Sequence, residues 1–142
     1  MLTVPSPIRF EGIHCQITLT RPAPGVAVLL MSGTDIGEFG DAVMRELQKD
    51  LDSGRPLALF FDAHSVKGAS IEVSHEWVQW ISAQRDGLAQ VRMLTGNRYV
   101  EMTANFARRF AGLQGIMRIY TDATAFTADI QAAVSAANKP GG

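Results

Sequence analysis

Four side chains that can act as acids, bases or metal ligands lie close together in the sequence: Asp62, His64, Glu72 and His75. Carboxylates and imidazoles bind zinc and related ions, and Glu72 and His75 have the spacing of one helix face. The same group has the chemistry for acid–base catalysis of a hydrolysis. A metal site needs convergent ligands, however, and a hydrolase needs an activated nucleophile, whereas Cys15 lies in a separate strand and no Gly-x-Ser-x-Gly pattern occurs. We therefore expect no catalytic residue, no metal and no cofactor, and keep a hydrolase-like enzyme only as a third alternative.

Gly33, Gly37 and Gly40 surround a predicted strand-to-helix turn, where free backbone amides can bind an anion. Their spacing matches neither the Gly-x-Gly-x-x-Gly pattern of dinucleotide sites nor the Walker pattern with its lysine. Close packing of a helix on a sheet explains such glycines, so we expect no phosphate-binding loop here.

The composition is that of an ordinary folded domain. The chain has 142 residues, of which 46% are hydrophobic and 19% are charged, which is enough to bury a single core. We expect an N-terminal arm over 1–7, one domain over 8–137 and a C-terminal tail over 138–142. A net charge of -1 gives no electrostatic reason to expect nucleic acid as a partner.

The expected location of the protein is the cytoplasm. The single cysteine, Cys15, cannot form an internal disulfide, and the first residues lack the basic and apolar layout of a signal peptide. The longest apolar runs, 26–31 and 57–61, are far shorter than the roughly 20 residues that span a bilayer. We therefore expect no integral membrane association.

Strand and helix patterns alternate along most of the chain. Alternating and continuous apolar runs predict strands, whereas apolar residues at a period near 3.6 predict helices. The expected strands are 8–20, 26–31, 57–62, 91–95 and 116–120. The expected helices run from Thr34 or Asp35 to about Asp52, from Ile71 to about Asp86, from a cap at Asn97 and from a cap at Asp122. The residues between the third strand and the second helix, 63–70, are expected to form a polar loop.

This order of elements predicts an α/β fold. Helices between strands indicate right-handed crossovers and therefore a mostly parallel central sheet. We expect about five strands, including an antiparallel N-terminal edge strand, with four helices packed on the sheet. Ligands and partners of such sheets gather outside the carboxyl ends of the strands. These ends are Ser32 to Asp35, 63–70, Thr95 to Arg98 and Tyr120 to Asp122.

The second predicted helix is apolar over a wider arc than one sheet face can cover. The side chains that project together from it are Val73, Trp77, Trp80 and Ile81. Ile71 and Val78 lie further round the helix and are expected to be partly exposed. Large aromatic side chains dominate interface energies when they lose their water, so this helix either lies in a broad core or forms a dimer or partner surface. In the third helix, the side chains that share one face are Tyr99, Met102, Phe106 and Phe110.

Arginines are concentrated in the last third of the chain. They are Arg92, Arg98, Arg108, Arg109 and Arg118. Some of them flank predicted strand ends, where they can hold an acidic partner or a lipid headgroup. A solvated charged face is the alternative interpretation.

The order of elements and three local patterns resemble the STAS family of sulfate transporters and anti-sigma-factor antagonists, including its divergent STAS/SEC14-like branch. Val26 to Gly33 is similar to that family's second strand, and Arg55 to Asp62 is similar to its central strand ending in aspartate. Ala123, Phe126 and Ile130 resemble its closing helix. The resemblance covers roughly 13–137, and it implies a STAS-like fold and a role in regulation or signal transduction.

In that family, a partner kinase phosphorylates the serine of an Asp-Ser pair at the start of the next helix. Counted from Asp62, Ser70 occupies the aspartate position here and Ile71 the serine position, so the pair is absent. Ser70 remains a candidate phosphosite, because the positive end of a helix stabilises a phosphate. Capping of the helix by Ser70 is the alternative, and contact with a ligand is another.

We therefore expect a non-enzymatic regulatory or scaffolding module that binds another protein, a second copy of itself included. The alternative is a carrier or sensor of a small apolar or lipid-like ligand, which requires an enclosed apolar cavity of roughly several hundred Å³. The expected partner-binding residues are Asp62, His64, Ser65, Lys67, Ser70, Ile71, His75 and Val78.

Overall fold

The computed structural model describes residues 5–139, which form six strands, four α-helices and one short 3-10 helix. The strands are β1 (Ile8–Glu11), β2 (Cys15–Ala23), β3 (Val26–Asp35), β4 (Leu57–Ala69), β5 (Leu88–Thr95) and β6 (Met117–Tyr120). The helices are α1 (Ala42–Asp52), α2 (Ile71–Ala83), α3 (Arg98–Phe110) and α4 (Ala123–Ala137), and the 3-10 helix is η1 (Arg85–Gly87). The expected mixed α/β fold is confirmed.

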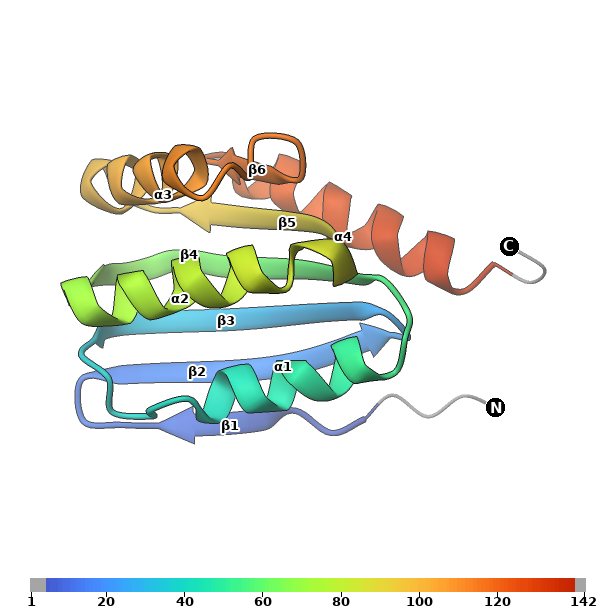
Figure 1. The fold of residues 1–142 in the computed structure, drawn as a ribbon, viewed down its shortest axis with the longest axis horizontal. Coiled ribbons are helices and arrows are strands. Elements are labelled where there is room, and N and C mark those ends of the chain that lie inside the picture. Colours follow the sequence, from blue (N-terminus) through green and yellow to red (C-terminus); the bar gives the residue numbers. More distant parts are fainter. Residues whose placement is uncertain (1–4, 140–142) are drawn as a thin grey trace.

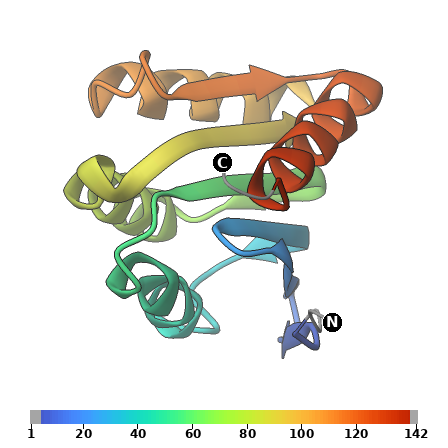
Figure 2. The same cartoon turned by 90° about the vertical axis from the view of Figure 1, so that its right-hand side faces the viewer.

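The strands form one sheet in the order β1-β2-β3-β4-β5-β6 (Figure 1). The first two pairs are antiparallel, and the pairs from β3 to β6 are parallel. Helices α1, α2 and α3 cover one face of the sheet, while α4 covers the other (Figures 1 and 2). Because side chains alternate across a strand, β4 contributes Leu59 and Phe61 to the larger core under α1 and α2. Phe60 points the other way, into the smaller core under α4.

The structure has two strands where the sequence predicted a single N-terminal strand. Residues 8–20 were expected to form one strand, but a turn around Gly12 and Ile13 separates β1 from β2. This turn is held by Glu38, whose carboxylate accepts hydrogen bonds from the N–H groups of Ile13 and His14 at 2.8 and 2.9 Å. The sheet consequently has six strands rather than about five, and β1 is its antiparallel edge.

The expected loop over 63–70 is wrong, because β4 continues to Ala69. The chain stays extended there since β3 also continues, to Asp35, and the two strands remain paired at Gly33 with Val66 and at Asp35 with Ala69. The helix expected from Thr34 or Asp35 therefore begins only at Ala42.

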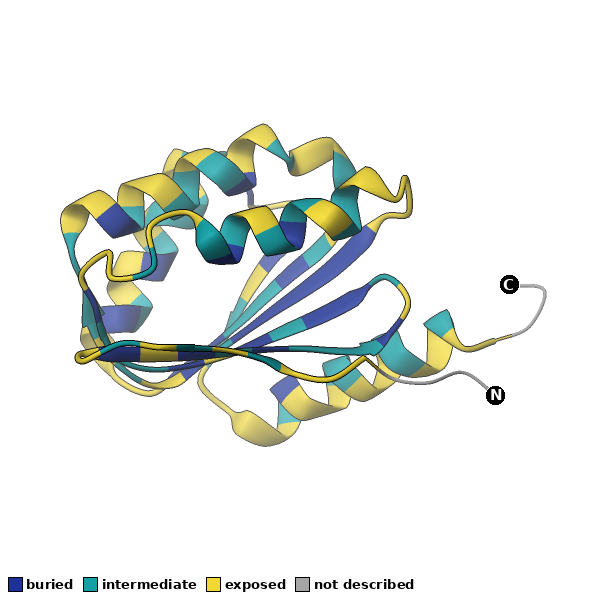
Figure 3. Ribbon diagram, turned by 90° about the horizontal axis from the view of Figure 1, so that it is seen from below, coloured by how far each residue is buried: buried dark blue, intermediate teal, exposed yellow. Residues whose placement is uncertain are grey.

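Helix α3 turns its largest apolar side chains away from the protein. They are Tyr99, Met102, Phe106 and Phe110, which are 65% to 74% exposed and which we call the outer apolar face of α3. The side chains turned to the sheet are smaller, with Val100 and Ala104 buried. Figure 3 shows how the buried segments follow the sheet and the sides of the helices that face it. The four residues do share one face, as expected, but that face is exposed.

Candidate apolar pocket

A pocket of about 140 Å³ lies between α2, α3 and the adjacent strands of the sheet. Its floor is formed by the sheet, its wall by α2 and its roof by α3. The floor includes Met31, Phe61, Ala63 and Met93; the wall includes Val73, Trp77, Val78 and Ile81; the roof includes Val100, Thr103, Ala104 and Ala107. Nearly all of these side chains are apolar, so the pocket offers van der Waals contact and few hydrogen bonds.

The pocket follows from the sizes of the side chains around it. Helix α3 places two alanines, Ala104 and Ala107, over the sheet, whereas its phenylalanines lie on the outer apolar face. The aromatic side chain that does border the pocket from α2, Trp77, packs edge-on against Phe61 with ring centroids 5.3 Å apart. Small side chains opposite a rigid aromatic pair leave the volume open.

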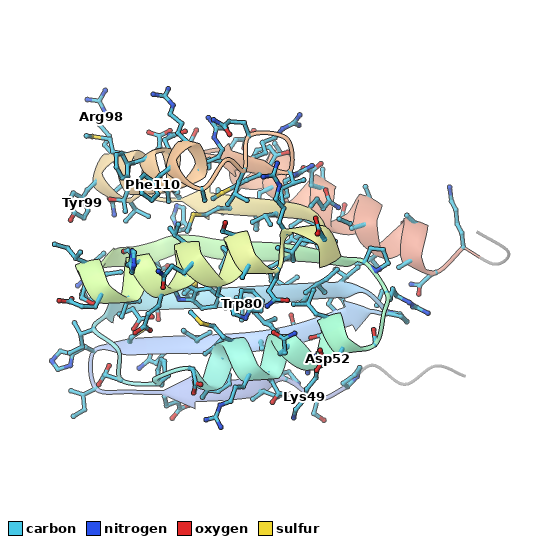
Figure 4. The ribbon with its side chains drawn as sticks, in the orientation of Figure 1. Lys49, Asp52, Trp80, Arg98, Tyr99 and Phe110 are labelled. Carbon is cyan, nitrogen blue, oxygen red and sulfur yellow. The ribbon has the colours of Figure 1, made fainter. Side chains whose placement is uncertain are left out.

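The second tryptophan lies on another side of α2. Trp80 borders a shallow depression between α1 and α2, together with Met44 and Glu76, and Figure 4 shows its side chain in that position. The two indoles meet edge-on with ring centroids 6.0 Å apart. Both are partly buried against the core, so the wide apolar arc of α2 is divided between the pocket, the core and the α1 side.

Cys15 borders the pocket from β2 and is only 3% exposed. The sequence placed Cys15 in an edge strand. In the structure β2 is an interior strand, because β1 lies outside it. Burial raises the pKa of the Cys15 thiol from 9.0 to about 11, and the negative charges of Asp35 and Glu38 add to the effect. The thiol is therefore protonated at neutral pH and is a poor nucleophile.

This pKa predicts slow alkylation of Cys15 in the folded protein. At pH 8 we expect iodoacetamide to react with the folded chain roughly 100-fold more slowly than with the urea-unfolded chain, because the pKa difference reduces the thiolate fraction by that factor. The folded state also holds the thiol proton more tightly. The contribution of the protonated thiol to the free energy of unfolding is therefore complete below about pH 9 and is lost as the pH rises towards 11. Mass spectrometry measures the two labelling rates. Equal rates at pH 8 in the folded and unfolded chain contradict the raised pKa of Cys15.

The predicted partner-binding residues do not converge on one site. His64, Ser65, Lys67, Ile71 and His75 are exposed, and Ile71 is 85% exposed, which agrees with the exposure expected of it. These residues follow β4 and the outer side of α2. The arrangement is an extended border rather than a pocket.

Asp62 is half-buried, and its Oδ1 accepts a hydrogen bond from the His64 N–H at 3.2 Å. Strand alternation places it on the sheet face opposite Phe61 and therefore opposite the pocket. Val78 is partly exposed, as expected. It also lines the pocket, which the sequence did not predict.

Ser70 is the N-cap of α2. Its Oγ accepts a hydrogen bond from the Val73 N–H at 3.2 Å, and its own N–H donates to the Asp35 carbonyl oxygen at 2.8 Å. Capping, one of the alternatives that the sequence left open, therefore describes its position. The role of Ser70 as a phosphosite stays a prediction.

The acids and imidazoles singled out first are spread over two elements. Within residues 5–139, no group of three or more His, Cys, Asp or Glu side chains is close enough to hold a metal ion. Asp62 and His64 belong to β4, whereas Glu72 and His75 are exposed on α2.

The arginines of the last third also separate. Arg92 is half-buried and donates to the Ile116 carbonyl oxygen at 2.7 Å, so it holds the β5–β6 edge together. Arg98 and Arg109 are exposed on α3 and Arg118 on β6, and Figure 4 shows Arg98 pointing away from the sheet. Arg108 is half-buried, and binding of an acidic partner by the exposed arginines stays a prediction.

The fold of the chain is found in a solved structure of another protein. It is an uncharacterised protein of the DUF3478 family from Shewanella loihica, described as having a SpoIIAA-like fold. The two chains superpose with a TM-score of 0.62 over 85% of this chain and 98% of that one, at 14% sequence identity. The fold is SpoIIAA-like. This is the fold of STAS domains, so the STAS-like fold expected from the sequence is confirmed.

At 14% identity, the SpoIIAA-like fold is all that this similarity establishes. No protein-family model matches the chain. No curated protein matches it either. Among the described residues, none of the helices has the length and apolar character needed to cross a membrane.

The pocket itself was not predicted from the sequence. The signal that was available is a face of small side chains on α3, where Val100, Thr103, Ala104 and Ala107 recur at spacings of three and four. Such a face opposite an aromatic-rich helix indicates either close helix packing or open volume. Only the distance between α2 and α3 decides between the two.

Proposed function

We propose that this SpoIIAA-like domain is a non-enzymatic binding module that takes a small apolar molecule into the pocket between α2 and α3. The observation that carries the proposal is the pocket, which is lined mostly by apolar side chains from five strands and two helices. Apolar cavities in proteins stay dry and bind apolar molecules. A site of this composition can select a ligand by shape and apolarity.

The size of the pocket limits the ligand. About 140 Å³ is close to the volume of an engineered protein cavity that binds benzene, and it is smaller than the several hundred Å³ expected of a lipid carrier. The proposed ligand is therefore a single ring or a short branched chain. A complete lipid acyl chain does not fit the observed volume.

Benzyl alcohol is a suitable neutral probe of this proposal. In a Trp80→Phe variant, Trp77 is the remaining tryptophan and borders the pocket, so its fluorescence is expected to change saturably as benzyl alcohol binds. Ala104→Leu places added atoms in the pocket and is expected to weaken binding at least tenfold. The fold of this variant is checked by urea unfolding.

The matched control is Ala128→Leu, which adds the same atoms at an exposed position of α4 on the other side of the sheet. Binding is expected to be unchanged in this variant. Unaltered affinity in Ala104→Leu, or equal losses in the two variants, contradicts ligand binding in this pocket.

A second function, regulation or scaffolding through binding of another protein, is supported by the outer apolar face of α3. Its four large side chains are 65% to 74% exposed, and Phe106 and Phe110 stack with ring centroids 5.9 Å apart. A contiguous exposed patch of this kind is typical of interaction surfaces. We propose this face as the partner-binding surface, in place of the border along β4 and α2. A cytoplasmic location belongs to the same proposal.

A further inference from the structure

Among residues 5–139, one charged side chain borders the mostly apolar pocket. Asp35 is the last residue of β3 and is 9% exposed. Asp35 lines the pocket together with Met31 and Gly33 of the same strand. Within the described part of the chain, no Lys, Arg or His lines the pocket. Since the Cys15 thiol keeps its proton, Asp35 supplies the negative charge of the pocket.

The Asp35 carboxylate is only partly satisfied by the protein. Its Oδ1 accepts a hydrogen bond from the Gly37 N–H at 3.0 Å. Among residues 5–139, no cationic side chain forms an ion pair with Asp35. The nearby Glu38 adds to the negative field, and its own carboxylate accepts two backbone N–H groups of the β1–β2 turn. A carboxylate that accepts one hydrogen bond from the protein keeps the capacity to accept a further donor.

We infer that the ligand of the pocket carries a hydrogen-bond-donating head, preferably a protonated amine, which binds Asp35 while its apolar body fills the space under α3. This inference rests on the proposed function of the pocket. A cation beside Asp35 offsets the buried charge and gains a charge-assisted hydrogen bond. A ligand with a carboxylate head is disfavoured, because two negative charges repel each other strongly away from water. The pocket therefore excludes aromatic and fatty acids in their anionic forms.

The test compares three probes with the same ring and different heads. At pH 7, benzylamine is a cation, benzyl alcohol is neutral and benzoate is an anion. With Trp77 fluorescence in the Trp80→Phe variant as the readout, we expect benzylamine to bind at least tenfold more tightly than benzoate, with benzyl alcohol between them. Asp35→Asn keeps an oxygen for the Gly37 N–H but removes the charge, and it is expected to reduce the difference to less than threefold.

The matched control is Asp62→Asn, because Asp62 also accepts a backbone N–H two residues ahead but faces the opposite side of the sheet. The preference for benzylamine is expected to persist in this variant. Asp35→Ser, which retains a short acceptor for Gly37, is the second variant if Asp35→Asn does not fold. The ligand series on the protein with Asp35 intact needs no folding control.

The possible results separate the two proposals. Equal binding of all three probes, or a preference for benzylamine that survives both Asp35 variants, overturns the role of Asp35 and leaves the apolar pocket in place. Failure of all three probes to bind overturns the pocket as a ligand site, and the role of Asp35 with it. Tighter binding of benzoate than of benzylamine overturns the inferred class of ligand.

Discussion

Replacing Gly96 with alanine is expected to lower the free energy of unfolding by about 3 kcal/mol, the upper end of what overpacking commonly costs. Gly96 follows β5 directly, where Thr95 pairs with Ala63 of β4. A Cβ atom at this position overlaps the His64 carbonyl oxygen and lies 2.8 Å from the His64 carbonyl carbon. Because these are backbone atoms of a central strand, they cannot move aside without breaking the β4–β5 pairing. Urea unfolding monitored by circular dichroism measures the loss.

Gly115→Ala is the matched control for this substitution. Neither glycine has a positive φ, so the backbone conformation does not distinguish them, and a Cβ at Gly115 meets nothing within 4 Å. The control is expected to change stability by less than about 0.5 kcal/mol. Similar unfolding midpoints for the two variants contradict the close approach of β5 to His64.

The features that depend on residues adjacent in the chain were predictable from the sequence. The side chains that cap helices each accept a backbone N–H in the first turn of the helix; they belong to Ser70, Asn97 and Asp122. Such capping is expected of short polar residues that precede a helical pattern of apolar residues. The apolar runs that form β3, β4 and β5 were found for the same reason. Local patterns were sufficient for the α/β class, and the resemblance to STAS domains added the STAS-like fold.

The lengths of β3 and β4 were not predictable in the same way. Residues 63–69 contain His64, Ser65, Lys67 and Gly68, which is a composition typical of a loop. They are extended because the end of β3 supplies backbone partners for them, and such pairing depends on residues about thirty positions away. The sequence alone does not contain this information in a local form.

The site was missed because the orientation of α3 is fixed by a contact outside the helix. Asn97 caps α3 by accepting the Val100 N–H at 2.8 Å, and its Nδ2 donates to the Val66 carbonyl oxygen of β4 at 3.0 Å. This pair of bonds ties the start of α3 to β4, with Val100 buried and Tyr99 65% exposed at the border of the pocket. An amphipathic pattern alone favours burial of the four large side chains. The helix therefore leaves both an apolar pocket inside and an apolar face outside.

The contrast between two phenylalanines tests this orientation of α3. Phe60 is 0% exposed and packs edge-on against Phe126 of α4 with ring centroids 5.9 Å apart. Phe60→Ala is therefore expected to lower the free energy of unfolding by about 3 to 5 kcal/mol, through lost burial and the cavity left behind. Phe106 is 69% exposed and touches mainly Phe110, so Phe106→Ala is expected to cost less than about 0.5 kcal/mol. Urea unfolding of the two variants gives both values.

The result for Phe106 decides more than stability. If the outer apolar face of α3 is free, removing Phe106 leaves the fold intact and weakens binding of the partner that covers this face, so stability and association change independently. A loss of several kcal/mol in Phe106→Ala contradicts the orientation of α3, because only an inward side chain makes so large a contribution. Helix α3 would then fill the space over Trp77 with its aromatic side chains, and the chain would have neither the pocket nor the partner surface proposed for it.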